Sequence, residues 1–208
     1  MKKLTGTFQL NSEKKIHSWY PYLAGFSSHL VMEKIKEYGL TSDSKIFDPF
    51  SGVGTTLLEA KLHNISSDGV EVNPFVSFVA NTKLEMNYDQ KELTERYNSI
   101  KFDLTSEYKS IQIEDQPELL RRVFSKEIFK KLLFIKRYIN NFTNEKIRNL
   151  FLLALISILK EVSNCKNFSP YIEMKDKPLL DAEIFQIYLK KIASMIKDIS
   201  DLHNTTHS

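Results

Sequence analysis

A short loop rich in glycine carries the residues whose types and spacing point most directly to chemistry. The string Asp48-Pro-Phe-Ser-Gly-Val-Gly-Thr-Thr56 leaves a predicted strand and opens a predicted helix. Glycines at such a junction let the backbone approach a ligand closely, and the first turn of a helix offers unpaired N–H groups to an anion such as a carboxylate. The string therefore predicts a ligand-binding turn.

Two familiar nucleotide-binding motifs do not fit this loop. Thr55 stands where a P-loop has its lysine, which disfavours a nucleoside triphosphate. Leu57 stands where a dinucleotide fingerprint has its third glycine. Glu71 follows Asp48 by 23 residues, at the end of the next predicted strand, where an acid can accept both ribose hydroxyls of an adenosyl ligand. The alternative is a tight turn beside an incidental acid, and the length of the string argues against it.

The elements that must position this loop form one strand–helix–strand unit. Residues 45–50 read as a buried strand, 55–63 as a helix and 66–72 as a second strand. This order implies a parallel pair of strands with a right-handed crossover. Asn73 followed by Pro74 predicts another helix start, because asparagine can cap a helix and proline suits its first turn.

Helical patterns dominate the rest of the chain. Upstream of the loop, Ser28 is a candidate N-cap for a short helix. Downstream, apolar residues recur at helical spacing over 93–108, 124–139, 147–162 and 184–202. The stretch 147–162 is apolar nearly all round, so we expect it to be buried centrally or against a partner.

Composition limits the class of protein. The chain has 208 residues, of which 42% are hydrophobic and 26% charged, so it is expected to be globular. Its single cysteine excludes an internal disulfide framework, and the five histidines have no metal-ligand spacing, so no metal is expected. The longest uncharged apolar run, Asn149 to Leu159, is too short to cross a bilayer. We therefore expect no membrane partner and a cytoplasmic protein.

Positive charge is concentrated in one segment. The net charge is +3, but residues 121–148 hold nine Lys or Arg against two Glu. Such an excess can serve as the electrostatic footprint of a phosphate backbone. A solvated helix face is the plainer interpretation of the same residues.

Three strings resemble motifs of the amino-group DNA methyltransferases, which methylate N4 of cytosine or N6 of adenine in restriction–modification systems and phages. The string from Asp48 to Ala60 resembles their S-adenosylmethionine-binding motif, and Glu71-Val-Asn-Pro74 resembles the acidic ribose-binding motif that follows. Upstream, His17-Ser-Trp-Tyr-Pro-Tyr-Leu-Ala-Gly-Phe-Ser27 resembles the segment that these enzymes place over the methionine end of the cofactor.

The resemblance implies a fold and a division of the chain. The fold class is α/β, with a partial Rossmann-like methyltransferase sheet of parallel strands and a helical C-terminal half. Residues 1–115 would form the S-adenosylmethionine-binding region. Residues 116–208 would form a helical region that packs on it or on a partner.

The resemblance also implies roles for the matched residues. Asp48 and the residues 52–56 would hold the methionine portion, Glu71 the ribose, and Asn73 with Pro74 the surroundings of the adenine. The upstream segment would form a lid, although aromatic clusters of this kind are more often core. The implied cofactor-binding residues are Tyr20, Pro21, Phe26, Ser27, Asp48, Pro49, Phe50, Gly52, Gly54, Thr55, Thr56, Glu71, Val72, Asn73 and Pro74.

One part of the family pattern is missing. The catalytic motif of this family is Ser, Asn or Asp followed by Pro-Pro and an aromatic residue, and it grips a base flipped out of the duplex. This chain has no Pro-Pro pair; Ser169-Pro-Tyr171 is one proline short, and a helix-to-loop turn explains it better. We therefore assign no catalytic residue. A split enzyme with the motif on a second chain, a truncated relic and a shortened sequence all fit, and we favour the split enzyme.

The resulting expectation is the cofactor-binding half of a site-specific DNA methyltransferase. Its expected cofactor is S-adenosylmethionine, and its expected partners are DNA and a second polypeptide that carries the catalytic motif. Without that polypeptide, the single chain would be inactive. An RNA or small-molecule methyltransferase is one alternative. A non-catalytic protein that binds S-adenosylmethionine or DNA and regulates a partner is the other.

Overall fold

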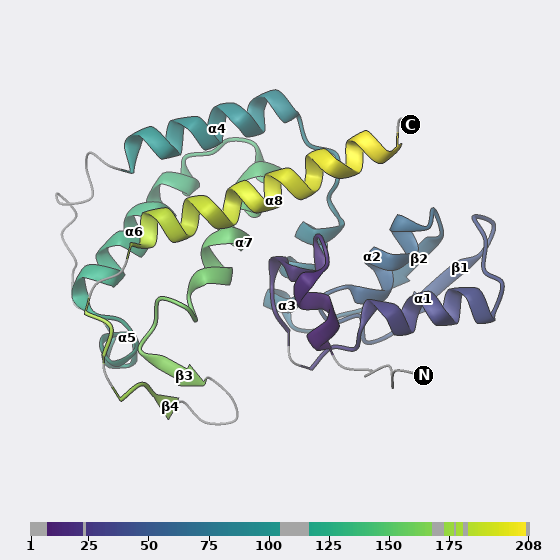
Figure 1. The fold of residues 1–208 in the computed structure, drawn as a ribbon, viewed down its shortest axis with the longest axis horizontal. Helices are drawn as coiled ribbons and strands as arrows, with labels where there is room; N and C mark the ends of the chain where they lie inside the picture. The colour runs from purple at the N-terminus through teal and green to yellow at the C-terminus, as the bar shows by residue number, and fades with distance from the viewer. Residues whose placement is uncertain are drawn as a thin grey trace. The chain divides into compact units, whose positions relative to one another are not determined.

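The computed structural model describes residues 8–22, 24–104, 117–167, 173–176, 178–180 and 183–206. The chain divides into two compact units, Met1–Asn87 and Tyr88–Ser208 (Figure 1). The expected boundary after residue 115 separates a cofactor-binding region from a helical region, and this functional division stays a prediction. Each unit is described by itself below.

The first unit is built around the strand–helix–strand motif that the glycine loop predicted. Its two strands run parallel, in a register from Lys45↔Ser66 to Asp48↔Gly69, and α2 connects them. Helix α2 packs on both strands and on α1 and α3 (Figure 1). The elements are η1 (Phe8–Glu13), η2 (His17–Trp19), α1 (Ser28–Glu37), β1 (Lys45–Asp48), α2 (Thr55–Leu62), β2 (Ser66–Gly69) and α3 (Pro74–Leu84).

The expectation of a buried first strand is wrong. Phe47 is 63% exposed, Lys45 is also exposed, and Ile46 and Asp48 are only half-buried. Among the described residues this sheet has two strands, so each strand has one neighbour. Parallel strands are buried where further strands and helices cover both faces, and these strands lack that cover. The two-stranded parallel sheet is therefore a partial methyltransferase-type sheet at most.

Side-chain caps fix where α1 and α3 begin. The Ser27 hydroxyl accepts a hydrogen bond from the Leu30 N–H at 3.3 Å, so Ser27, and not Ser28 as predicted, is the N-cap of α1. The prediction that Asn73 caps the next helix is confirmed, because its Oδ1 accepts from the Phe75 N–H at 2.9 Å. Both caps satisfy N–H groups that a helix start otherwise leaves unpaired.

The second unit is mostly helical. Helix α7 (Glu145–Ile158) contacts α6 (Lys126–Asn140) and α8 (Ile184–Thr206), and α8 also contacts α4 (Gln90–Asp103) (Figure 1). Most apolar side chains of α7 are buried within this unit, which is the first of the two expectations for this stretch, and the helix ends at Ile158. The remaining elements are α5 (Glu118–Val123) and the antiparallel pair β3 (Cys165–Asn167) and β4 (Glu173–Met174).

The described part of the chain contains neither a candidate membrane span nor a candidate metal centre. None of its helices has the length and apolar character needed to span a membrane. Nor do its His, Cys, Asp and Glu residues form a group that could hold a metal ion.

Candidate functional site

Two acids lie at the same edge of the parallel sheet. Asp48 ends β1 and pairs in register with Gly69, the last residue of β2. The Val70 N–H donates to the Asp48 carbonyl oxygen at 3.0 Å, and Glu71 follows directly. Both acids therefore come at the carboxyl ends of neighbouring parallel strands, which is where open α/β sheets bind ligands.

Each of these acids holds the turn that follows it. Asp48 Oδ1 accepts from the Phe50 N–H at 3.0 Å, and Glu71 Oε1 accepts from the Asn73 N–H at 2.7 Å. Within the described ranges neither carboxylate accepts a further hydrogen bond. One oxygen of each half-buried carboxylate is thus left to accept from a ligand hydroxyl or amine.

The loop between β1 and α2 is tied to β2 and closely approached by α3. The backbone N–H and the hydroxyl of Ser51 both donate to the Val70 carbonyl oxygen, at 3.0 and 3.2 Å. Gly54, the N-cap of α2, has φ +79°, and a Cβ there would lie 3.2 Å from Ala80 Cβ. The loop therefore needs glycine at 54 both for its left-handed backbone and for the contact with α3.

The N-terminus of α2 has no side-chain cap, unlike those of α1 and α3. Gly54 offers no side chain, and no cap hydrogen bond is made. The amides of the first turn, at Thr55 and Thr56, precede the first intrahelical bonds and carry the positive end of the helix dipole. This helix start is suited to an anionic group.

Exposed apolar side chains follow both acids. Phe50 is 87% and Val72 is 92% exposed, two residues after Asp48 and one residue after Glu71 respectively. Pro49 is exposed as well. Exposed apolar side chains thus stand next to both acids in the sequence, and small-molecule sites combine apolar and polar groups in this way.

The predicted lid residues fall into two places. The Tyr20 ring packs edge-to-face on Phe75 at the start of α3, with ring centroids 5.6 Å apart, next to Asn73 and Pro74. Burial raises the pKa of the Tyr20 hydroxyl. Phe26 instead lines an apolar pocket between α1, β1 and the start of α2, together with Thr56. The hydroxyl of Ser27 is engaged as the cap of α1.

A buried polar network, which the sequence did not reveal, fixes the upstream segment. His17 Nε2 lies 2.8 Å from Glu59 Oε1 of α2, and both side chains are almost completely buried. Lys83 of α3, only 1% exposed, donates from Nζ to the carbonyl oxygens of His17 and Tyr20 at 3.2 and 3.4 Å. Buried charged groups of this kind persist only when paired. The network therefore anchors η2 to α2 and α3 and so positions Tyr20.

The protonation of His17 predicts a pH dependence of stability. Burial lowers the pKa of His17 below its ordinary value of 6.5, although Glu59 acts in the opposite direction. The unfolded chain therefore binds the proton first as the pH falls, and the free energy of unfolding should decrease below about pH 6.5. Urea unfolding of the wild type between pH 8 and pH 5 measures this decrease, and His17→Gln should lose less over the same range. Equal losses in the two proteins would contradict this role of His17.

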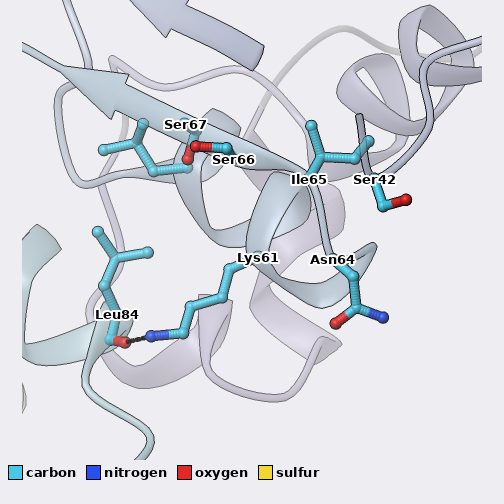
Figure 2. Close-up of a pocket in the computed structure, with 8 residues that line it drawn as sticks. Ser42, Lys61, Asn64, Ile65, Ser66, Ser67 and Leu84 are labelled. Carbon is cyan, nitrogen blue, oxygen red and sulfur yellow. Dashed lines mark hydrogen bonds between the residues drawn. The ribbon is translucent and has the colours of Figure 1, made fainter. Parts of the chain in front are cut away.

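A separate pocket lies at the other end of the strands. It has a volume of about 560 Å³, and Lys61 at its wall donates from Nζ to the Leu84 carbonyl oxygen at 2.5 Å (Figure 2). The pocket is lined by Ser42, Leu57, Lys61, Asn64, Ile65, Ser66, Ser67 and Leu84. These residues include the start of β2, so the pocket is distinct from the edge that carries Asp48 and Glu71. The string Ser169-Pro-Tyr171 lies outside the described residues.

Comparison with known proteins finds relatives of one kind. The chain is 33% identical to the type II methyltransferase M.BsoBI of Geobacillus stearothermophilus, over 80% of this chain and 33% of that protein. It is 29% identical to the type II methyltransferase M.MjaII of Methanocaldococcus jannaschii, over 83% of this chain and 34% of that protein. A third type II methyltransferase, M.MvaI of Kocuria varians, is 24% identical over 90% and 44%.

The similarity covers only part of each relative. The chain spans about a third of the length of the first two of these relatives. No family model and no solved structure matches it. The resemblance to DNA methyltransferases is confirmed, whereas the amino-group subclass stays a prediction. The chain is a homologue of the type II methyltransferases, the modification enzymes of restriction–modification systems.

Proposed function

We propose that this chain is the cofactor-binding part of a site-specific DNA methyltransferase that transfers a methyl group from S-adenosylmethionine to the exocyclic amine of cytosine or adenine. The observation that carries the proposal is the pair of acids, Asp48 and Glu71, at neighbouring strand ends beside the uncapped start of α2. The kinship with type II methyltransferases supports the same conclusion.

The residues at this edge match the chemical groups of S-adenosylmethionine. The first-turn amides of α2 suit its carboxylate, and Asp48 suits the rest of the methionine portion. The second oxygen of Glu71 suits the ribose hydroxyls. Phe50 and Val72 give exposed apolar surface for the adenine, near the turn that Asn73 and Pro74 form. When bound, the cofactor supplies a methyl group activated on a sulfonium, and these residues bind and orient it.

We further propose that the catalytic motif comes from a second polypeptide. The sequence contains no Pro-Pro pair, so the motif that grips the flipped base in this family has no full counterpart here. Phe47 of β1 and Val70, directly after β2, are 63% and 49% exposed, so α2 covers only part of the apolar surface of the small sheet. Because parallel sheets are stable when covered on both faces, a partner that completes this sheet would also remove its exposed apolar surface.

Calorimetry and a methyl-transfer assay on the purified full chain test both parts. We expect S-adenosylmethionine to bind, Asp48→Ala to weaken that binding at least tenfold, and the chain alone to transfer no methyl group to duplex DNA. Asp89→Ala is the matched control, because Asp89 Oδ1 also accepts a backbone N–H two residues ahead, in the second unit.

The possible outcomes separate the two parts of the proposal. No binding of S-adenosylmethionine by the wild type, or equal affinities of wild type and Asp48→Ala, would reject the cofactor site. Robust methyl transfer by the chain alone would reject the second polypeptide.

A further inference from the structure

An excess of positive charge lies on two consecutive helices of the second unit. Residues 118–140, which form α5, α6 and the turn between them, contain seven Lys or Arg and two Glu. Their net charge is +5, whereas the whole chain carries +3, so the remaining residues carry −2. The basic character is therefore local.

Helix α6 presents part of this charge on one outward face. Its buried stripe contains Ile128, Leu132, Ile135 and Ile139. With 3.6 residues per turn, Lys126, Lys130 and Arg137 lie on the opposite face, and the first and last are about three turns, or ~16 Å, apart. Lys126 and Arg137 are exposed and Lys130 is half-buried.

Helix α5 adds two further cations close to α6 in the sequence. Arg121 and Arg122 are both exposed and precede α6 by a few residues. We call the five residues Arg121, Arg122, Lys126, Lys130 and Arg137 the basic surface.

A solvated helix within the same chain has a different charge pattern. On α1, acids and bases are interspersed, and Lys34 Nζ pairs with Glu37 Oε2 at 2.6 Å. His29 and Glu33 face each other one turn apart on the same helix. Mixed signs with pairs of this kind are typical of a helix face that faces water. Helix α6 instead contains five Lys or Arg and a single acid, Glu127, so its charges do not balance in this way.

We propose that the basic surface binds the phosphate backbone of duplex DNA. The inference rests on the proposed function, which makes DNA the substrate, and it adds the part of the chain that holds the duplex. Lys and Arg side chains on phosphates position a protein on DNA without reading its sequence. The surface would therefore supply affinity and orientation, and base recognition would come from elsewhere.

Binding of a labelled 20-base-pair duplex to the full chain, measured by fluorescence anisotropy, tests this surface. We expect Lys126→Glu/Arg137→Glu to weaken binding at least tenfold and to reduce the slope of log affinity against log salt by about 2, since each phosphate contact contributes about 0.9. The control is Lys190→Glu/Lys197→Glu on exposed positions of α8, which makes the same change in net charge. The control should weaken binding less than threefold.

Several results would overturn the proposal. These are equal weakening by the two double variants, unchanged binding by Lys126→Glu/Arg137→Glu, no duplex binding by the wild type at low salt, or stronger binding of RNA than of duplex DNA. Circular dichroism checks that each variant folds. If the charge-reversal variant does not fold, Lys126→Gln/Arg137→Gln replaces it and is expected to weaken DNA binding about threefold or more.

Calorimetry with S-adenosylmethionine on the same samples separates this proposal from the proposed function. If Lys126→Glu/Arg137→Glu still binds the cofactor and its DNA binding is unaltered, the basic surface alone is rejected. If the wild type binds duplex DNA but not the cofactor, and Lys126→Glu/Arg137→Glu loses the DNA binding, the cofactor site alone is rejected.

Discussion

Replacing Glu71 by alanine is expected to weaken the binding of S-adenosylmethionine by about ten- to a hundredfold. One oxygen of Glu71 already accepts the Asn73 N–H at 2.7 Å, which leaves the other for the ribose hydroxyls. A hydrogen bond to a charged group contributes about 1.5–3 kcal/mol. Because about 1.4 kcal/mol corresponds to tenfold in affinity, the loss of this acceptor gives the stated range.

The chain contains a close control for this substitution. Glu85 Oε1 accepts the Asn87 N–H at 2.7 Å, which repeats the Glu-x-Asn contact of Glu71 at the C-terminal end of α3. Glu85→Ala removes the same kind of turn contact away from the strand ends, so affinity should stay within about twofold of the wild type. Glu71→Gln keeps an acceptor for Asn73 but loses the charge, and its affinity should be intermediate.

Calorimetric titration of the four proteins measures the effect. Unchanged affinity in Glu71→Ala would remove Glu71 from the cofactor site. A loss in Glu85→Ala as large as in Glu71→Ala would instead trace the effect to α3 and its turns.

Features set by neighbouring residues could be predicted from the sequence. The strand before the glycine loop, the helix after it, the next strand and the cap at Asn73 all follow from patterns within a few residues, and the structure confirms these elements. The central position of α7 followed from its apolar character on all sides. Local chemistry was sufficient in each case.

Features that depend on distant residues could not be predicted in the same way. His17 and Glu59 are 42 residues apart and Lys83 lies 66 residues from His17, so their contacts exist only after the chain has folded. The burial of the first strand was overestimated at Phe47, because an apolar residue is buried only where neighbouring elements cover it.

The N-cap of α1 shows that the exact start of a helix is also hard to predict from the sequence. Ser27 and Ser28 have the same side chain, so composition cannot decide which of them leaves the helical conformation first. The structure uses Ser27, whose φ and ψ are extended. This assignment matters for the candidate site, since it engages the hydroxyl of a residue that the motif placed in the lid.

Gly69→Ala is expected to lower the free energy of unfolding by about 1–3 kcal/mol, the usual cost of overpacking a tight contact. A Cβ on Gly69 would lie 2.8 Å from both Leu57 Cδ1 and Ser51 Cβ. The Leu57 side chain can rotate, but Ser51 Cβ is attached to the loop backbone, which two hydrogen bonds tie to Val70. The loop must therefore move, and we expect the affinity for S-adenosylmethionine to fall at least tenfold as well.

Urea unfolding and calorimetry check both effects, with Ser66→Ala at an exposed position of the same strand as the control. The control should change the free energy of unfolding by less than about 0.5 kcal/mol, as surface substitutions usually do. An equally small change in Gly69→Ala would contradict the contact.

A double-mutant cycle with Ser51→Gly tests the cause of the loss. Ser51→Gly removes the Cβ that Gly69→Ala would meet, so the double variant should lose less stability than the two single losses added together. If the losses in free energy of unfolding add fully, the contact with Ser51 is not the cause of the destabilisation by Gly69→Ala. A coupled loss would show that the glycine of β2 and the loop that carries the candidate cofactor site are fitted to each other.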